Sequence, residues 1–94
     1  MPFILECLDK PGQLELRLKN RPDHLAYVER HLAHVVVAGP IMAEDGQTPI
    51  GSLLILDLPD RRAVEAFAAE DPYAKAGLFE TVTIRPWRRV FPKD

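Results

Sequence analysis

Short apolar runs alternate along the chain with segments in which apolar residues recur every three or four positions. The short runs cover residues 2–8, 35–43, 50–58 and 79–89. They are rich in aliphatic and β-branched side chains and are bounded by turn-forming Pro, Gly or Asp residues, which is typical of β-strands. The sequence therefore predicts four strands, and Pro40 places the second at a sheet edge or a bulge.

The segment before the second strand predicts a helix. Pro22 suits the first turn of a helix, and apolar residues follow it at helical spacing up to residue 35. These apolar residues are Leu25, Val28, Leu32 and Val35. Residues 14–19 alternate as in a strand but are all good helix formers, so a short helix is favoured there.

A second helix is predicted between the third and fourth strands. Asp60 is a good N-cap residue, and Pro72 disfavours helical geometry at Asp71, where the helix should end. A loop over residues 72–77 then leads to the last strand. The apolar face of this helix holds Val64, Phe67 and Ala68.

The resulting order is β-α-β-β-α-β, which predicts an α+β, ferredoxin-like domain spanning residues 1–94. Its two helices would cover one face of a four-stranded antiparallel sheet. Both sheet faces carry apolar side chains, since Leu53 and Ile55 alternate with Leu54 and Leu56 in the third strand. A second subunit would bury the other apolar face of the sheet, so we expect a homodimer.

Composition and charge exclude several classes of protein. The chain has 94 residues, 47% of them hydrophobic and 28% charged, which fits a globular domain. Twelve basic and 14 acidic residues give a net charge of -2, which argues against nucleic acid or an anionic membrane as partner. The single Cys7 forms no disulfide framework, and the start of the chain lacks signal-peptide features, so we expect a cytoplasmic protein.

An ionisable residue interrupts the apolar face of each helix. His24 lies at the border of the first apolar stripe, and Asp71 continues the second at the next helical step. A carboxylate bonded to one imidazole nitrogen fixes the tautomer and leaves the other nitrogen to exchange protons with a ligand. The spacing alone also fits a boundary histidine and a helix-ending aspartate.

Several short motifs in this order resemble the YciI-like, or YCII-related, family over essentially the whole chain. They are Arg21-Pro22-Asp23-His24, Ala38-Gly39-Pro40, Gly51-Ser52-Leu53, Asp71-Pro72-Tyr73-Ala74 and Ile84-Arg85-Pro86-Trp87. The resemblance implies a ferredoxin-like fold that dimerises through its sheet as a dimeric α+β barrel. It also implies a pocket with a His–Asp pair, carried here by His24 and Asp71. Most family members have no assigned reaction, and a minority act on chlorinated aromatic breakdown products.

Other residues are candidates for ligand binding. Ser52 follows Gly51, where a glycine permits close approach of a ligand to the backbone. As a nucleophile Ser52 would require His24 as its base, so a pocket-lining role is favoured. Tyr73 either lines the pocket or is a half-buried loop aromatic.

Charged and metal-binding residues offer weaker candidates. Arg17 and Arg21 either anchor an acidic substrate or are solvated helix charges. His31 and His34 have a spacing compatible with a metal, but no third ligand is patterned nearby, so no metal is expected. Cys7 is expected to be a small buried hydrophobe.

Two functions remain open from the sequence. The first is a small-molecule enzyme of the isomerase or lyase (dehalogenase-like) type, in which His24 and Asp71 perform general acid–base chemistry. No Walker A or GxGxxG motif occurs, and no cofactor is expected. The alternative is a non-catalytic dimer that binds a metabolite or serves regulation.

Overall fold

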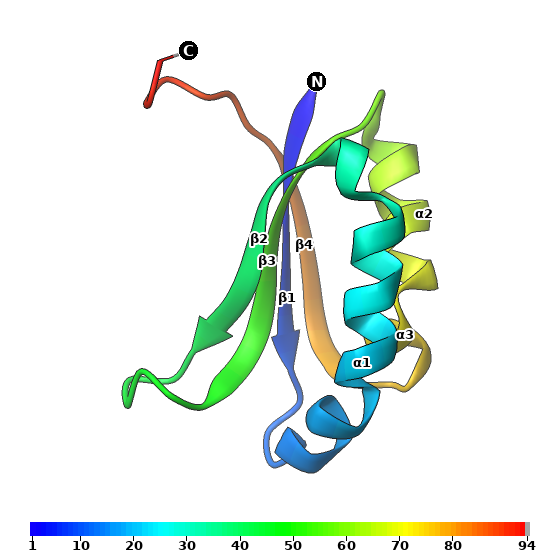
Figure 1. Cartoon of the computed structure of the whole chain (residues 1–94), viewed down its shortest axis with the longest axis vertical. Coiled ribbons are helices and arrows are strands. Elements are labelled where there is room, and N and C mark those ends of the chain that lie inside the picture. The colour runs from blue at the N-terminus through cyan, green and yellow to red at the C-terminus, as the bar shows by residue number, and fades with distance from the viewer. Residues whose placement is uncertain (94) are drawn as a thin grey trace.

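The computed structural model describes residues 1–93. They form a four-stranded antiparallel sheet with all helices on one face (Figure 1). The elements are β1 (Pro2–Asp9), α1 (Leu14–Arg30), a 3₁₀ turn (Leu32–His34), β2 (Val35–Met42), β3 (Pro49–Asp57), α2 (Arg61–Glu70), α3 (Pro72–Lys75) and β4 (Phe79–Pro86). The strand order is β2-β3-β1-β4. The predicted α+β, ferredoxin-like class is confirmed, with α3 as an additional short helix. No helix of the described chain is long and apolar enough to cross a membrane.

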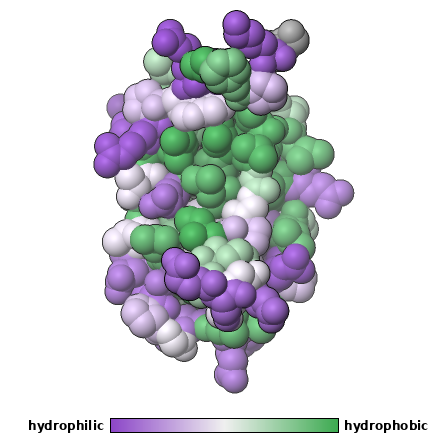
Figure 2. Space-filling view, turned by 90° about the vertical axis from the view of Figure 1, so that its left-hand side faces the viewer, coloured by the Kyte–Doolittle hydropathy of each residue, from purple (hydrophilic) through white to green (hydrophobic). Residues whose placement is uncertain are grey.

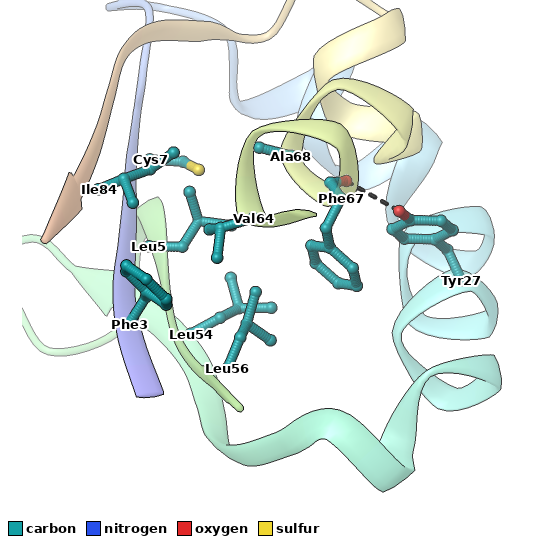
Figure 3. Close-up of a cluster of buried hydrophobic side chains, with 10 residues drawn as sticks. All are labelled: Phe3, Leu5, Cys7, Tyr27, Leu54, Leu56, Val64, Phe67, Ala68 and Ile84. Carbon is teal, nitrogen blue, oxygen red and sulfur yellow. Dashed lines mark hydrogen bonds between the residues drawn. The ribbon is translucent and has the colours of Figure 1, made fainter. Parts of the chain in front are cut away.

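The core lies between the sheet and the helices (Figure 3). Alternate residues of β1 and β3 face the helices and are almost fully buried, as expected from the period of two along a strand. These strand residues are Phe3, Leu5, Cys7, Leu54 and Leu56. The Tyr27 hydroxyl of α1 donates a hydrogen bond of 2.8 Å to the Phe67 carbonyl of α2, which ties the two helices together (Figure 3).

Helix α2 follows the sequence prediction closely. Val64, Phe67 and Ala68 form its buried face, as predicted. Asp60 is its N-cap, and its side chain accepts a hydrogen bond of 2.9 Å from the Ala63 amide. This bond satisfies one of the free amides in the first turn.

Helix α1 begins eight residues earlier than Pro22, at Leu14. The prediction that Pro22 starts the helix is therefore wrong, whereas the helical conformation favoured for residues 14–19 is confirmed. The good helix formers of that segment continue directly into the rest of the helix. Pro22 lies inside the helix, where it removes one backbone donor but leaves the helix continuous.

The buried face of α1 also differs from the predicted one. Leu25 and Leu32 are 44% and 61% exposed, whereas Arg17, His24 and Tyr27 are buried. The leucine stripe faces a cleft instead of the core. The helix ends at Arg30 rather than at residue 35, because the chain turns through residues 32–34 into the β-branched start of β2.

Two further boundaries correct the sequence prediction. The expected loop over residues 72–77 contains helix α3, with Asp71 as N-cap and Pro72 in the first turn. Strand β4 ends at Pro86 rather than at residue 89. β2 is an edge strand with register irregularities at both ends, as Pro40 indicated.

The sheet face away from the helices carries an apolar patch (Figure 2). Ile4, Ile55 and Val37 belong to this open face, since they alternate with the core residues and Ile55 pairs with both Ile4 and Val37. Leu53 lies on the same face, two residues before Ile55 on β3. Leu53 is 36% exposed and Val37 is 55% exposed. The predicted two-sided apolar sheet is therefore present.

Candidate functional site

A cleft of about 540 Å³ opens between α1 and the strands β2 and β3. A volume of this size falls within the range of small-molecule sites, roughly 300–1,000 Å³. Most of its wall is apolar and includes Leu18, Leu25, Val28, Leu32, Val35 and Pro40. The polar side chains in the wall are Arg17, Arg21, His24, Gln47, Ser52 and Tyr73. No described residue of the wall is acidic.

His24 and Asp71 meet beside this cleft. The Nδ1 atom of His24 lies 2.9 Å from Oδ1 and 3.0 Å from Oδ2 of Asp71, and both side chains are buried. Asp71 is in extended conformation, as favoured before Pro72, and its Oδ1 also accepts the Tyr73 amide at 2.9 Å. One carboxylate thus caps α3 and holds the histidine of α1. The pair that the helical spacing allowed and the family resemblance implied is in contact, and its chemical role stays a prediction.

The second ring nitrogen of His24 remains accessible. Nε2 makes no hydrogen bond within residues 1–93, and within that range no fully buried side-chain nitrogen or oxygen lacks a partner. Nε2 therefore retains accessible surface, and His24 is in the cleft wall. The ring stacks on Tyr73 with centroids 4.1 Å apart, which fixes its orientation.

Arg17 is a buried site residue that the solvated-helix interpretation missed. It lies two turns before His24 on α1 and is only 4% exposed. Its Nη1 donates to both carboxylate oxygens of Asp9 at 2.9 and 3.0 Å. Burial raises the pKa of Asp9, and the charge and hydrogen bond of Arg17 oppose that rise. The seven-residue spacing, which places Arg17 on the same helix face as His24, is the signal that could have identified it.

Ser52 on β3 is bonded to the same guanidinium. Nη2 of Arg17 donates a hydrogen bond of 2.8 Å to Ser52 Oγ, and Ser52 is 2% exposed. Since a guanidinium is never a base in proteins, this partner cannot remove the serine proton as nucleophilic catalysis requires. The arrangement fits the pocket-lining role of Ser52.

Tyr73 and Arg21 complete the polar part of the wall. The Arg17 guanidinium lies 4.6 Å from the Tyr73 ring centroid, a cation–π contact. Burial raises the pKa of the Tyr73 hydroxyl against the opposing charges of Arg17 and Arg21, so Tyr73 is protonated at neutral pH. Arg21 lies on the exposed side of the cleft.

Gly51 is required by the sheet itself. A Cβ atom at this position would lie 2.5 Å from the carbonyl oxygen of Cys7 on β1. The group that approaches the glycine closely is therefore a neighbouring strand, not a ligand as the sequence suggested. This tight packing sets the position of the adjacent Ser52.

The remaining candidates lie apart from this chemistry. The His31 ring is bonded through Nδ1 to the Tyr27 carbonyl at 2.9 Å, and no group of three potential metal ligands occurs in the described part of the chain. Cys7 is 1% exposed in the core, as predicted. Burial, together with the charges of Asp71 and Asp9, raises the pKa of its thiol to about 12.

Known proteins resemble this chain in sequence, in fold or in both. Protein YciI of Escherichia coli is 36% identical over 100 residues, covering 97% of this chain and all of the relative. The 5-chloro-2-hydroxyhydroquinone dehydrochlorinase of Burkholderia phenoliruptrix, solved with 2,5-dihydroxybenzoquinone, is 34% identical, with a TM-score of 0.89 over the whole of both chains. A protein of Bacteroides thetaiotaomicron named as an antibiotic biosynthesis monooxygenase is 15% identical, with a TM-score of 0.58 over 98% of this chain and 90% of that one, and shares the fold alone.

The family model of the YCII-related domain matches residues 1–88, a range that contains both members of the His–Asp pair and the whole sheet. The chain belongs to the YCII-related family.

Proposed function

We propose that this protein is a small-molecule enzyme of the lyase type, in which His24 transfers protons and Asp71 orients it. The observation that carries the proposal is the contact of Nδ1 with both oxygens of Asp71, while Nε2 is left to the cleft. A carboxylate beside Nδ1 favours the tautomer with the proton on Nδ1. The lone pair of Nε2 is then available as a general base, and Asp71 stabilises the imidazolium that forms.

The reaction proposed is the elimination of HX from a hydroxylated ring. Nε2 takes a hydroxyl proton and returns it to the ring carbon that bears the leaving group X. Nε2, deprotonated again by the first transfer, then takes a second hydroxyl proton as X leaves as an anion with the electron pair of the C–X bond. Protons and electrons balance without an external oxidant. The dehydrochlorinase with 34% identity over the whole chain supports this reaction class.

The charge of the cleft supports an oxygen-rich or anionic ligand. Its described wall holds Arg17 and Arg21 but no carboxylate, because Asp9 and Asp71 lie behind Arg17 and His24. Ser52, Arg21 and Tyr73 bind the ligand in this proposal. The apolar remainder of the wall accommodates the ring and its substituents.

The proposal includes a homodimer formed through the open face of the sheet. Exposed contiguous apolar surface on a small domain marks an interaction site, and a twofold pairing covers two such faces at once. The patch of Figure 2, with Leu53 and Val37 exposed in the single chain, supports this arrangement.

The test is an anaerobic assay with 5-chloro-2-hydroxyhydroquinone, which follows chloride release and the absorbance of the quinone product. We expect turnover by the wild-type protein and a loss of about 10²–10⁴-fold in kcat for His24→Gln. His34→Gln, on an exposed residue outside the cleft, is the matched control and should keep the wild-type rate. Binding of this and related halogenated rings without chloride release would contradict the proposal and favour the non-catalytic binding module.

A further inference from the structure

The guanidinium of Arg17 is shared between two buried partners on different strands. It gives Nη1 to Asp9 at the end of β1 and Nη2 to Ser52 on β3. All three side chains lie in or directly behind the cleft wall, and those of Arg17 and Asp9 are 4% and 7% exposed. A charged side chain in this position is held by its neighbours rather than by solvent.

The hydrogen bond from Arg17 determines whether the Ser52 hydroxyl donates or accepts. Arg17 only donates, so Ser52 Oγ is the acceptor of their hydrogen bond. The hydroxyl has one proton of its own, and Ser52 Oγ donates to no acceptor within the described chain. Because Ser52 is in the cleft wall, that proton is left for a molecule bound in the cleft.

The positive charge of Arg17 affects which kind of ligand atom Ser52 binds best. A serine that accepts a bond from a cation is a stronger donor and a poorer acceptor than a free one, because bonded groups polarise one another. The best ligand atom for such a group is an oxygen that has lone pairs and carries no hydrogen, namely a carbonyl or phenolate oxygen. Tyr73, which lies against Arg17 and is a protonated donor at neutral pH, has the same preference.

We infer that Ser52 donates to a carbonyl or deprotonated oxygen of the ligand and that Arg17 is a positioning residue that acts through Ser52. The inference rests on the proposed function only in placing the ligand in the same cleft. Asp9 keeps the buried charge of Arg17 compensated, so that Arg17 can hold Ser52 without itself binding the ligand.

A double-mutant cycle on binding tests this inference without turnover. The probe is 2,5-dihydroxybenzoquinone, and its dissociation constant is measured by absorbance titration for wild type, Ser52→Ala, Arg17→Lys and the double variant. Lysine retains a charge beside Asp9 but cannot hold two partners in fixed directions as a guanidinium does. We expect each single variant to bind about tenfold more weakly, and the double variant no more weakly than Ser52→Ala.

Arg62→Lys, on an exposed residue of α2, is the matched control and should bind as wild type does. Unchanged affinity in Ser52→Ala, a further loss when Arg17→Lys is added to it, or no binding of the probe to wild type at millimolar concentration would overturn the inference. If Arg17→Lys fails to fold, hydroquinone, whose ring oxygens all carry hydrogen, decides the matter with wild type. It should bind at least about tenfold more weakly than the probe, and equal affinity would overturn the inference.

A failure of the proposed function can be distinguished from a failure of this inference. If only the proposed function fails, the Ser52–Arg17 binding cycle gives the expected result while His24→Gln still releases chloride at the wild-type rate. Conversely, an additive cycle with a strong loss of turnover in His24→Gln would overturn the role of Arg17 alone.

Discussion

The imidazole of His24 on α1 contacts both carboxylate oxygens of Asp71, 47 residues further along the chain, at 2.9 and 3.0 Å. The same carboxylate accepts the Tyr73 amide and so caps the helix that carries the aromatic ring stacked on His24. The histidine is thereby fixed at one nitrogen and along one ring face. The other ring nitrogen, Nε2, makes no hydrogen bond within residues 1–93.

We predict that Asp71→Asn reverses the tautomer of His24. The asparagine carbonyl can still cap α3, and its amide nitrogen then donates to Nδ1, so the ring proton moves to Nε2. Long-range ¹H–¹⁵N correlation spectra of the ring distinguish the two forms. We expect an Nδ1–H ring in wild type and an Nε2–H ring in the variant. The same nitrogen pattern in both proteins would contradict the orienting role of Asp71.

We predict that Gly51→Ala destabilises the protein, because the added Cβ would lie 2.5 Å from the backbone oxygen of Cys7. Overpacking of this kind costs about 1–3 kcal/mol, measured as the loss in free energy of unfolding in urea. Gly39→Ala is the control, since a Cβ there meets no atom within 4 Å. A Gly51→Ala variant as stable as Gly39→Ala would show that β1 and β3 leave room for a side chain at residue 51.

Alkaline pH should destabilise the fold through Cys7. Its folded pKa is raised from 9.0 to about 12, so the folded state keeps a proton that the unfolded state loses above pH 9. Stability is therefore present below pH 9 and falls as pH rises towards 12, by about 1.4 kcal/mol per pH unit for this thiol. Urea unfolding of wild type and Cys7→Ala at pH 8 and pH 10 measures the difference. The stability advantage of wild type should shrink at pH 10, and a constant difference would exclude the proposed coupling.

The open face of the sheet predicts a dimer that a single charge disrupts. Light scattering at micromolar concentration should give twice the chain mass of 10.6 kDa for wild type. Leu53→Asp places a charge in the apolar patch and should give the mass of one chain, because burying an unpaired carboxylate is costly. Leu14→Asp, an exposed leucine at the start of α1, should remain dimeric. A wild-type protein with the mass of one chain would rule out this use of the patch.

The strands and helix α2 could be predicted from the sequence because local pattern and burial agree there. Val64, Phe67 and Ala68 repeat at helical spacing and do enter the core. In α1 the apolar and buried positions differ, because a cleft separates much of this helix from β2. Leu25 and Leu32 satisfy the helical pattern but line the cleft wall, and no local pattern distinguishes a cleft from a core.

The His–Asp pair was predicted because His24 and Asp71 fall at the borders of apolar patterns and because the short motifs that contain them resemble the YCII-related family. Arg17 was not, because an arginine among charged neighbours usually marks a solvated surface. Its burial depends on two partners that are distant along the chain, Asp9 and Ser52, which only the sheet register brings within reach. The role of Gly51 likewise depends on a backbone contact between strands.

The rate of HX elimination in a His24–Asp71 mutant cycle tests the central claim most directly. With 5-chloro-2-hydroxyhydroquinone as substrate, kcat/KM is measured for wild type, His24→Gln, Asp71→Asn and the double variant. If Asp71 acts by orienting His24, His24→Gln should lose about 10²–10⁴-fold and the double variant no more than that. Additive losses, or a His24→Gln protein with the wild-type rate, would contradict proton transfer by this pair.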